Sequence, residues 1–343
     1  MDIGLVGLGR MGLNMALRLR RDGHRVVVHN RSPEPVEVAE GEGAERAETL
    51  QALVDRLETP RVVWLMLPAG EVTSAHVTDT LAVLEPGDVL VDGSNNRWTE
   101  TLRHATEARE LGVSFVDVGV SGGVWGLENG YSLMAGGDSE AVALVEPALR
   151  TLAPAPDSGW GRVGPTGAGH FVKMVHNGVE YGMMQAFAEG FAVLAAKDDW
   201  GEADGEPIEQ ALDLGAVAEI WRTGSVIQSW LLDLTAEVLR ERPGLDGVAP
   251  FVPDSGEGRW AVEAAIDLRV AVPVIAASLF NRFSSRDERR IADRVLSAMR
   301  GQFGGHTVKG QPGEGEDIRG DGTIDVVPGG VQTEGASTRP DMD

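Results

Sequence analysis

The 343-residue chain contains two different patterns of apolar and polar positions, one in each half. Over the first 165 or so residues, short runs rich in apolar and β-branched side chains alternate with stretches of helical periodicity, for example Met11–Arg21 and Trp98–Leu111. The runs typical of buried strands read IGLVG, RVVVHN, RVVWLMLP, DVLVDGS and SFVDVGV. Alternation of this kind predicts βαβ units and an α/β domain with a doubly wound, parallel sheet.

The second pattern begins at about Gly167, where runs typical of strands end and long helical patterns follow. These patterns cover Gly169–Ala196, Pro207–Leu239, Trp260–Asn281 and Arg286–Arg300. Beyond residue 310 the chain is rich in Gly, Pro and acidic residues with few large apolar side chains, so we expect disorder there. The expected organisation is therefore an α/β domain at 1–165, an all-helical substrate and oligomerisation domain at 166–310, and an acidic tail at 311–343.

A glycine-rich turn directly follows the first expected strand. Residues 7–12 read GLGRMG, a G-x-G-x-x-G that opens the first expected helix. Gly7 allows the tight turn, Gly9 lets the backbone approach a pyrophosphate, and Gly12 lets the helix pack closely on the strand. The alternative is an ordinary turn, but the strand–turn–helix context is the one that a dinucleotide site requires. We expect a Rossmann-like domain whose cofactor contacts include Gly7, Gly9, Arg10, Met11 and Gly12.

The end of the second expected strand indicates which dinucleotide is bound. NAD-binding domains usually place an acidic residue there for the ribose hydroxyls. This chain has Asn30 at that point, followed by Arg31 and Ser32. A neutral amide, a guanidinium and a hydroxyl accept a 2′-phosphate that a carboxylate would repel, which favours NADP over NAD. The alternative is that Arg31 is simply a solvated loop residue.

A polar stripe runs along the first long helical pattern of the second half. Its residues are Lys173, His176, Asn177, Glu180 and Tyr181, which fall within an arc of about 140° on a helix. The other sides of this helix are apolar or glycine, so we expect it to be buried, where charges are costly unless they are paired or used. The alternative is an ordinary solvated stripe. A lysine and a glutamate beside a histidine and an asparagine favour an acid–base site.

Charge and composition exclude several classes of function. The chain carries 53 Asp and Glu against 30 Lys and Arg, a formal net charge of −23, so we exclude nucleic acid as a partner. Lysine occurs only at positions 173, 197 and 309, and the first of these lies in the polar stripe. Seven histidines lie without ligand spacing, and cysteine is absent, so no metal is expected.

Nothing in the chain predicts secretion or membrane insertion. The N-terminus runs from Met1 straight into a strand pattern without the basic and apolar regions of a signal peptide. No apolar run approaches the ~18–20 residues needed to span a bilayer. A protein without cysteine fits a reducing compartment. We expect a cytoplasmic protein with no membrane partner.

Four segments carry a resemblance to a known family. GLGRMG, NRS, VSGG and KMVHNGVEYGMMQ resemble the decarboxylating 6-phosphogluconate dehydrogenases, in their shorter prokaryotic form, over residues 1 to about 308. The most specific piece is K-x-x-H-N-x-x-E-Y. The sister β-hydroxyacid dehydrogenases, which act on 3-hydroxyisobutyrate and similar acids, usually have K-x-x-N-N there.

The resemblance implies a reaction and two catalytic residues. Lys173 is expected to remove the proton from the 3-hydroxyl of 6-phosphogluconate as hydride leaves C3 for the nicotinamide. The 3-keto acid then loses carbon dioxide to give an enediol, and Glu180 is expected to help protonate its C1. Desolvation would lower the pKa of the lysine, and burial would raise the pKa of the glutamate. The product is ribulose 5-phosphate.

The resemblance also implies the residues that bind substrate. Asn95, which also contacts cofactor, and the Ser121-Gly122-Gly123 turn are expected to hold the sugar acid together with His176 and Asn177. The phosphate is expected to meet Tyr181 and Arg282. Arg300 and His306, in RGQFGGH, are expected to reach into the active site of a neighbouring subunit, which implies a homodimer or homotetramer. The expected substrate-binding residues are thus Asn95, Ser121, Gly122, Gly123, His176, Asn177, Tyr181, Arg282, Arg300 and His306.

Two departures from the family pattern and three alternatives remain open. The larger enzymes have a lysine and a threonine in the segment where this chain has Ser255 and Glu257, so phosphate binding would rest more on Tyr181 and the arginines, Arg259 among them. The short forms also include users of NAD. The alternatives are the same reaction with NAD, a sister dehydrogenase of the 3-hydroxyisobutyrate type, and a catalytically silent nucleotide sensor.

Overall fold

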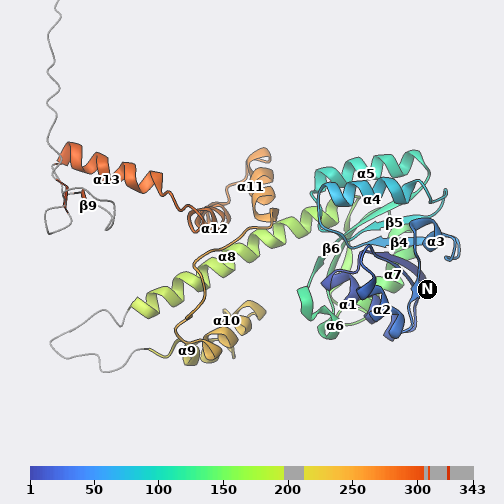
Figure 1. Ribbon diagram of the computed structural model, residues 1–343, viewed down its shortest axis with the longest axis horizontal. Coiled ribbons are helices and arrows are strands. Elements are labelled where there is room, and N and C mark those ends of the chain that lie inside the picture. The colour runs from blue at the N-terminus through green and yellow to red at the C-terminus, as the bar shows by residue number, and fades with distance from the viewer. Residues whose placement is uncertain (197–211, 305–307, 310–322, 325–343) are drawn as a thin grey trace, which may run out of the picture. The chain divides into compact units, whose positions relative to one another are not determined.

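The computed structural model describes residues 1–196, 212–304, 308–309 and 323–324 (Figure 1). It divides into two compact units. The first consists of Met1–Ala249 and Pro253–Phe280, and the second of Pro250–Val252 and Asn281–Asp343. All of the sheet and the helix that carries the polar stripe belong to the first unit.

An eight-stranded sheet forms the centre of the N-terminal half, in the order β3-β2-β1-β4-β5-β6-β7-β8. Every neighbouring pair is parallel except β6 and β7, which are antiparallel. The order reverses between β1 and β4, the point at which doubly wound sheets bind nucleotides. The strands are β1 (Asp2–Val6), β2 (Arg25–His29), β3 (Glu45–Arg46), β4 (Val62–Leu65), β5 (Val89–Asp92), β6 (Ser114–Ser121), β7 (Ser132–Gly136) and β8 (Trp160–Gly164).

Helices cover both faces of this sheet, as the expected Rossmann-like fold requires (Figure 1). One face carries α1 (Arg10–Arg21), α2 (Pro33–Gly41) and α7 (Ser139–Leu152). The other carries α3 (Leu50–Val54), α4 (Glu71–Leu81) and α5 (Trp98–Glu110). A short 3-10 turn, Gly123–Trp125, and α6 (Gly126–Asn129) follow β6.

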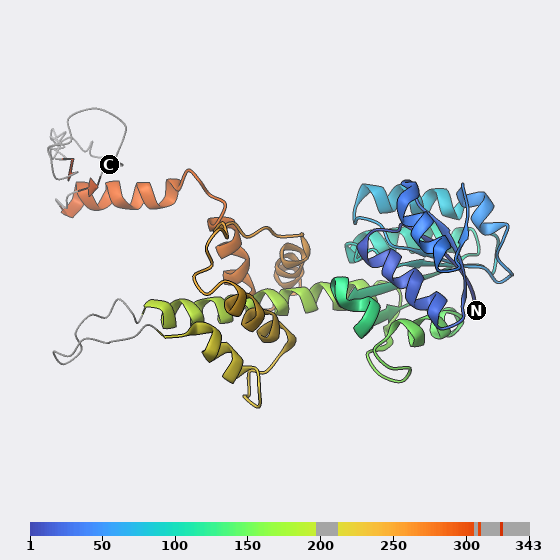
Figure 2. The ribbon, with the colours of Figure 1, turned by 60° about the horizontal axis from the view of Figure 1, so that its bottom comes forward.

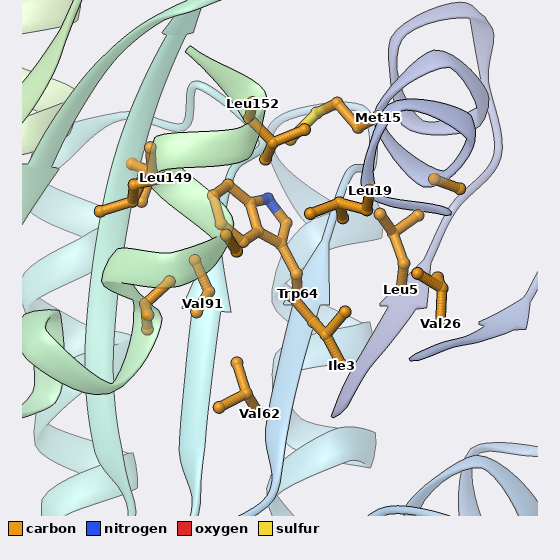
Figure 3. Close-up of a cluster of buried hydrophobic side chains, with 14 of the residues drawn as sticks. Ile3, Leu5, Met15, Leu19, Val26, Val62, Trp64, Val91, Leu149 and Leu152 are labelled. Atoms are coloured by element: carbon orange, nitrogen blue, oxygen red, sulfur yellow. The ribbon is translucent and has the colours of Figure 1, made fainter. Parts of the chain in front are cut away.

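Two apolar cores lie on the two faces, because successive strand side chains point to opposite sides of the sheet. On β4, Val62 and Trp64 belong to the core under α1 and α7, whereas Val63 and Leu65 belong to the other core. Figure 3 shows the Trp64 ring among side chains from neighbouring strands and helices, including Leu5, Leu19, Leu149 and Leu152. Burial on both faces explains why the parallel strands are continuous apolar runs.

The 29-residue helix α8 (Ala168–Ala196) connects the sheet to the helical part of the first unit. Its first turns pack on β6 and β7. Near its far end, Phe191 packs with α9 (Leu214–Trp221) and α10 (Trp230–Glu241). Figures 1 and 2 show both helices beside that end of α8. In its middle, α11 (Glu257–Asp267) packs closely, since a Cβ on Gly178 would lie 3.2 Å from that of Ala261.

The expected burial of α8 is wrong for its apolar side. The apolar residues Val175, Val179, Met183 and Met184 are exposed in the described part of the chain. Its buried residues include Lys173, Asn177 and Tyr181, so the polar stripe faces the interior. Glycines make this possible, because they let α11 and the sheet approach the same side of the helix.

Several expected element bounds are also corrected. The structure adds β3, β7 and β8, which are short or glycine-rich. The pattern expected to be one helix over Pro207–Leu239 contains α9 and α10 with a break between them, and 207–211 lie outside the described residues. Likewise, Trp260–Asn281 is divided between α11 and α12 (Pro273–Ser284), since Arg269 takes a φ of +59° between them.

The second unit contains α13 (Ile291–Gly304) and a two-stranded antiparallel pair, β9 (Val308–Lys309) with β10 (Thr323–Ile324). The tail expected to be disordered, 311–343, lies outside the described residues except for β10. The boundary expected at 165/166 stays a prediction. Among the helices that the structure describes, none has the length and apolar character of a membrane span.

Candidate active site

The glycine-rich loop lies between β1 and α1, at the reversal of strand order. Gly7 has a φ of +92°, and a Cβ there would overlap the carbonyl of Met66. A Cβ on Gly12 would overlap the carbonyl of Gly7, so only glycine allows this helix to start so close to the strand. Apart from its chain neighbours, no atom of the described residues lies within 4 Å of a Cβ placed on Gly9. The loop thus leaves room for a phosphate at the N-terminus of α1.

The side chain of Asn30 forms hydrogen bonds with the backbone of the glycine-rich loop and of its own turn. Its Oδ1 accepts the N–H of Leu8 at 2.9 Å, and its Nδ2 donates to the carbonyl of Ser32 at 2.9 Å. Arg31 and Ser32 are exposed. The side chains available to a ribose substituent at this strand end are therefore those of Arg31 and Ser32.

Asn95 joins the loop after β5 to β6. Its Nδ2 donates to the carbonyl of Val120 at 2.9 Å, and its Oδ1 accepts the N–H of the same residue at 2.8 Å. Asn95 itself has a φ of +51°, a conformation that asparagine tolerates. This two-way bond fixes the end of β6, where Ser121 leads into Gly122 and Gly123, which have φ values of +138° and +57°. The positive φ values explain the two glycines of the VSGG segment.

Lys173 is the central group of the site. Its side chain is on α8, the residue is only 5% exposed, and Nζ donates to Oδ1 of Asn177 one turn later. Burial lowers the pKa of Lys173, and the carboxylates of Glu180 and Glu257 raise it by a smaller amount. The expected direction of this pKa shift is confirmed, and it makes Lys173 a base at lower pH than an ordinary lysine.

His176 and Glu180 extend the same stripe toward solvent. Nδ1 of His176 lies 3.1 Å from Oδ1 of Asn177 and 3.9 Å from Oε2 of Glu180. The side chain of Glu180 is 38% exposed, so the expectation of a buried glutamate is wrong. Lys173, Asn177, His176 and Glu180 therefore form a connected chain of polar groups from the interior to the surface.

A cavity of about 600 Å³ brings together most of the expected catalytic and substrate-binding residues. Its walls come from the glycine loop, the loop after β5, the end of β6, α8 and α10. Those lining residues are Met11, Asn95, Val120, Ser121, Gly122, Gly123, Lys173, His176, Asn177, Val179, Glu180, Met183, Ser229, Trp230, Leu231 and Leu234. A second cavity of about 400 Å³ shares Ser121, Gly122, His176 and Trp230 with it.

Two groups of lining residues were not predicted from the sequence. Trp230 and its neighbours on α10 form one wall, and no motif marks them. Trp125 is 53% exposed and lines the second cavity with Trp230. Its position two residues after Gly123 was the available signal.

Tyr181 lies on the opposite side of the stripe from the cavity lining. Its hydroxyl accepts the N–H of Ser255 at 3.2 Å, and the Ser255 hydroxyl donates to Oε2 of Glu257 at 2.5 Å. A Cβ on Gly258 would overlap the Tyr181 ring, which accounts for that glycine. In the segment that departs from the family pattern, Ser255 therefore contacts Tyr181 directly, and Glu257 is connected to Tyr181 through Ser255.

The remaining expected residues are not brought to this cavity by the structure. Arg282 and Arg300 belong to the second unit, in α12 and α13, and His306 lies outside the described residues. Arg259 forms an ion pair with Asp254 at 2.9 Å. Within residues 1–196 and 212–304, no three His, Asp or Glu side chains are placed to hold a metal ion together.

These features support binding of a dinucleotide along the loop and removal of a proton inside the cavity. The loop offers a helix N-terminus without a side-chain cap in the described structure, and Met11 connects it to the cavity of Lys173. A buried amine with a lowered pKa beside that cavity can accept a proton from a bound alcohol.

Comparisons with known proteins cover nearly the whole chain. Residues 2–161 match the family described as the NAD binding domain of 6-phosphogluconate dehydrogenase, and 169–311 match the 6-phosphogluconate dehydrogenase C-terminal domain. The chain is 42% identical over 309 residues to the NAD(+)-dependent, decarboxylating 6-phosphogluconate dehydrogenase of Haloferax volcanii, covering 90% of this chain and 98% of the relative. It is 38% identical to the putative 6-phosphogluconate dehydrogenase YqeC of Bacillus subtilis, covering 90% and 99%.

A solved structure agrees with these matches. Plasmodium falciparum 6-phosphogluconate dehydrogenase, studied in its apo form and with its cofactor NADP+ and its substrate 6-phosphogluconate, superposes with a TM-score of 0.74 at 28% identity. The match covers 92% of this chain and 67% of that protein. The fold expected from the sequence is therefore confirmed over both halves.

Proposed function

The chain belongs to the 6-phosphogluconate dehydrogenase family, and we propose that it oxidatively decarboxylates 6-phospho-D-gluconate to D-ribulose 5-phosphate and carbon dioxide, reducing NADP. One observation carries the proposal. The buried amine of Lys173, bonded to Asn177, lines a cavity together with Glu180 and the Ser121–Gly123 turn. A base and a second acid–base group on one face of one helix suit a reaction that needs both.

Lys173 removes the proton of the substrate 3-hydroxyl. Its neutral form is the base, and burial lowers its pKa and so favours that form. Asn177 holds Nζ through its Oδ1, which fixes the direction from which the amine meets the substrate. Met11 and Asn95, which line the same cavity, would hold a nicotinamide ring, and that ring would supply the acceptor for the hydride from C3.

Glu180 supplies the proton that C1 takes up after carbon dioxide has left. When carbon dioxide leaves, the electron pair of the broken C–C bond remains in the enediol. Protonation then forms a C–H bond at C1 of the enediol, the carbon from which carbon dioxide has left. The side chain of Glu180 lies at the cavity wall and is 38% exposed, so it can exchange protons with water between turnovers. His176 lies between Glu180 and Asn177 and joins the two halves of the stripe.

The substrate carboxylate is bound by the Ser121-Gly122-Gly123 turn. The backbone there is free of Cβ atoms at the two glycines, and the Ser121 hydroxyl and His176 line the same wall. Asn95 fixes the turn through Val120 and thereby sets its distance from Lys173. Substrate and cofactor then meet at Asn95 and Met11, which line one cavity.

Phosphate binding involves Tyr181, Arg282, Arg300 and His306 in our proposal. The Tyr181 hydroxyl accepts the backbone N–H of Ser255 at 3.2 Å, and a phenol hydroxyl is also a possible donor to a phosphate oxygen. Arg300 lies at the end of α13, a helix that exposes Ile291, Val295, Leu296 and Met299. Such an exposed apolar stripe supports a homodimer or homotetramer in which the neighbouring subunit contributes Arg300 and His306.

The choice of NADP rests on Arg31 and Ser32. Both are exposed at the end of β2, where no carboxylate occupies the position used for ribose hydroxyls. NAD is the second candidate, because the Haloferax volcanii relative is named as NAD(+)-dependent, whereas the Plasmodium falciparum structure includes NADP+. In either case, Gly7, Gly9, Arg10 and Gly12 hold the pyrophosphate.

Such an enzyme belongs to the oxidative pentose phosphate pathway and to gluconate utilisation in the cytoplasm. Its product is a phosphorylated ketopentose and its second product a reduced nicotinamide. These assignments follow from the proposed reaction.

The proposal is tested by following reduced-nicotinamide absorbance with 6-phosphogluconate and either NADP or NAD, at low and at molar salt. We expect turnover that is faster with NADP. Turnover mainly with NAD would keep the reaction and contradict the role given to Arg31 and Ser32. Turnover with 3-hydroxyisobutyrate and none with 6-phosphogluconate would assign the chain to the sister activity instead.

A further inference from the structure

One face of β6 contacts both the start of α8 and the cavity of the proposed site. Asp117, Gly119 and Ser121 occupy alternate positions and therefore point to the same face. Ser121 lines the cavity, and a Cβ on Gly119 would lie 2.5 Å from that of Lys173. Asp117, the third member of this row, is 0% exposed and has no part in the proposed chemistry.

The carboxylate of Asp117 binds the start of α8. Its Oδ1 accepts the N–H of Gly167 at 2.6 Å, and its Oδ2 accepts the N–H of His170 at 2.8 Å. Both N–H groups lie at the helix start, where backbone donors have no partner within the helix. A strand side chain thus takes the place that a capping residue of the helix itself would usually have.

The start of α8 is in close contact with the backbone of the sheet. A Cβ on Gly169 would overlap the carbonyl oxygens of Asp117 and Met134, and one on Gly136 would lie 2.6 Å from Oδ1 of Asp117. The backbone of α8 therefore rests directly on β6 and β7. Because the interior is closely packed, a change in the two Asp117 bonds shifts the helix start rather than a side chain alone.

A second attachment ties the same turn to α5. Nδ1 of His170, which is 1% exposed, lies 2.7 Å from Oγ1 of Thr101. His170 also favours the charged form of Asp117, whereas burial raises the pKa of that carboxyl more strongly. Lys173 follows one turn after Gly169, so these bonds set its height above β6.

We propose that Asp117 is a positioning residue for Lys173. By holding the first turn of α8 against β6 and β7, it fixes Nζ relative to the Ser121–Gly123 turn. The proposal rests on the proposed function, in which Lys173 is the base. A generic helix cap contributes little to the stability of a protein, but a displacement of about 1 Å at a reacting group can lower the rate about 100-fold. Asp117 should therefore affect turnover more than it affects stability.

The test compares Asp117→Asn with a matched control, Asp88→Asn, in the full-length protein. Asp88 is also buried, and its carboxylate also accepts two backbone N–H groups, those of Arg61 at 2.8 Å and Glu85 at 2.9 Å, and in addition the Arg61 guanidinium at 3.1 Å. It lies just before β5, and it is absent from the lining of the described cavity. In each variant the new amide can accept only one of the two bonds, because its NH₂ group faces the other N–H.

We expect Asp117→Asn to lower kcat by roughly 10- to 100-fold, with the KM for the cofactor within about threefold. Asp88→Asn should lower the thermal midpoint by a similar amount and leave kcat within about threefold. An equal loss of kcat in the two variants, or normal kcat in Asp117→Asn, would overturn the proposal. If Asp117→Asn does not fold, Thr101→Val removes the His170 attachment and should lower kcat in the same direction.

A second readout does not depend on activity. Because the chain has lysine only at positions 173, 197 and 309, amine labelling followed by peptide mass spectrometry measures Lys173 with two internal references. Lys173 should react several-fold faster in Asp117→Asn than in the wild type or Asp88→Asn. An unchanged labelling rate would contradict the positioning role. If the labelling rate changes but the wild-type protein does not turn over 6-phosphogluconate, the proposed function is contradicted and the positioning role is supported.

Discussion

The two sides of α8 reverse the usual distribution of polar and apolar residues. On the side that faces the sheet and α11, Lys173, Asn177 and Tyr181 are buried. On the other side, Val175 and Val179 are exposed. Burial of a lysine that forms no ion pair lowers the stability of a fold. A valine that stays exposed to water adds no free energy of burial. In our proposal the buried side carries the chemistry, and the exposed apolar side is available to a cofactor, a substrate or another subunit.

The largest expected effect comes from removing the amine on the buried side. Lys173→Ala should lower kcat by about 10³-fold or more, while the dissociation constant of the cofactor changes little. Among the described lining residues, the other possible proton acceptors are His176 and Glu180, and both lie farther along α8. The matched control is Val175→Ala, two residues along the same helix, which should retain kcat within about threefold. Near-normal turnover by Lys173→Ala in steady-state assays would contradict the assigned chemistry.

Glu180 lies between the two sides and should have the next largest effect. Glu180→Gln keeps the shape of the side chain and removes the proton donor, so kcat should fall about 100-fold. Glu189→Gln changes another α8 glutamate, one that accepts a bond from Gln185, and should leave kcat nearly unchanged. Steady-state kinetics with 6-phosphogluconate provide the measurement. Equal rates for the two variants would remove Glu180 from the mechanism.

Arg282 should act on binding rather than on turnover. Loss of a charged hydrogen bond to phosphate should raise the KM for 6-phosphogluconate roughly 10- to 100-fold in Arg282→Ala. Since gluconate lacks the phosphate, its much weaker turnover should be unaffected. Arg289→Ala, nearby in sequence, provides the control. A parallel rise of KM for gluconate would show that Arg282 does not contact the phosphate.

The smallest expected effect is a shift of the pH profile. Activity should rise with pH as Lys173 loses its proton, and the acidic limb of kcat/KM should lie below the ordinary pKa of lysine because burial lowers it. Glu257 raises the pKa of Lys173, so Glu257→Gln should move that limb to lower pH. Glu263→Gln, on the exposed part of α11, should leave the limb in place. A shift of the Glu257→Gln limb to higher pH would be inconsistent with this electrostatic arrangement.

Much of this site could be predicted from local spacing. The glycines at 7, 9 and 12 and the polar residues from 173 to 181 lie within single elements, where periodicity fixes which side chains share a face. The strands of the parallel core were equally clear, since burial on both faces makes them continuous apolar runs.

What could not be predicted depends on contacts between distant parts of the chain. β7 and β8 contain glycines and polar residues, and β8 lies at the sheet edge, where pairing is stabilised without an apolar pattern. The wall supplied by Trp230 depends on how α10 packs near α8. The attachment of Asp117 to α8 joins a strand to a helix about 50 residues later, and no spacing rule predicts it.

The most direct test of the central claim measures carbon dioxide and reduced nicotinamide together during turnover of 6-phosphogluconate by the wild-type enzyme. If the Lys173 side of α8 catalyses oxidation followed by decarboxylation, the two products form in a one-to-one ratio, with ribulose 5-phosphate as the third. Reduction of the nicotinamide without release of carbon dioxide would contradict the account and indicate a simple hydroxyacid dehydrogenase.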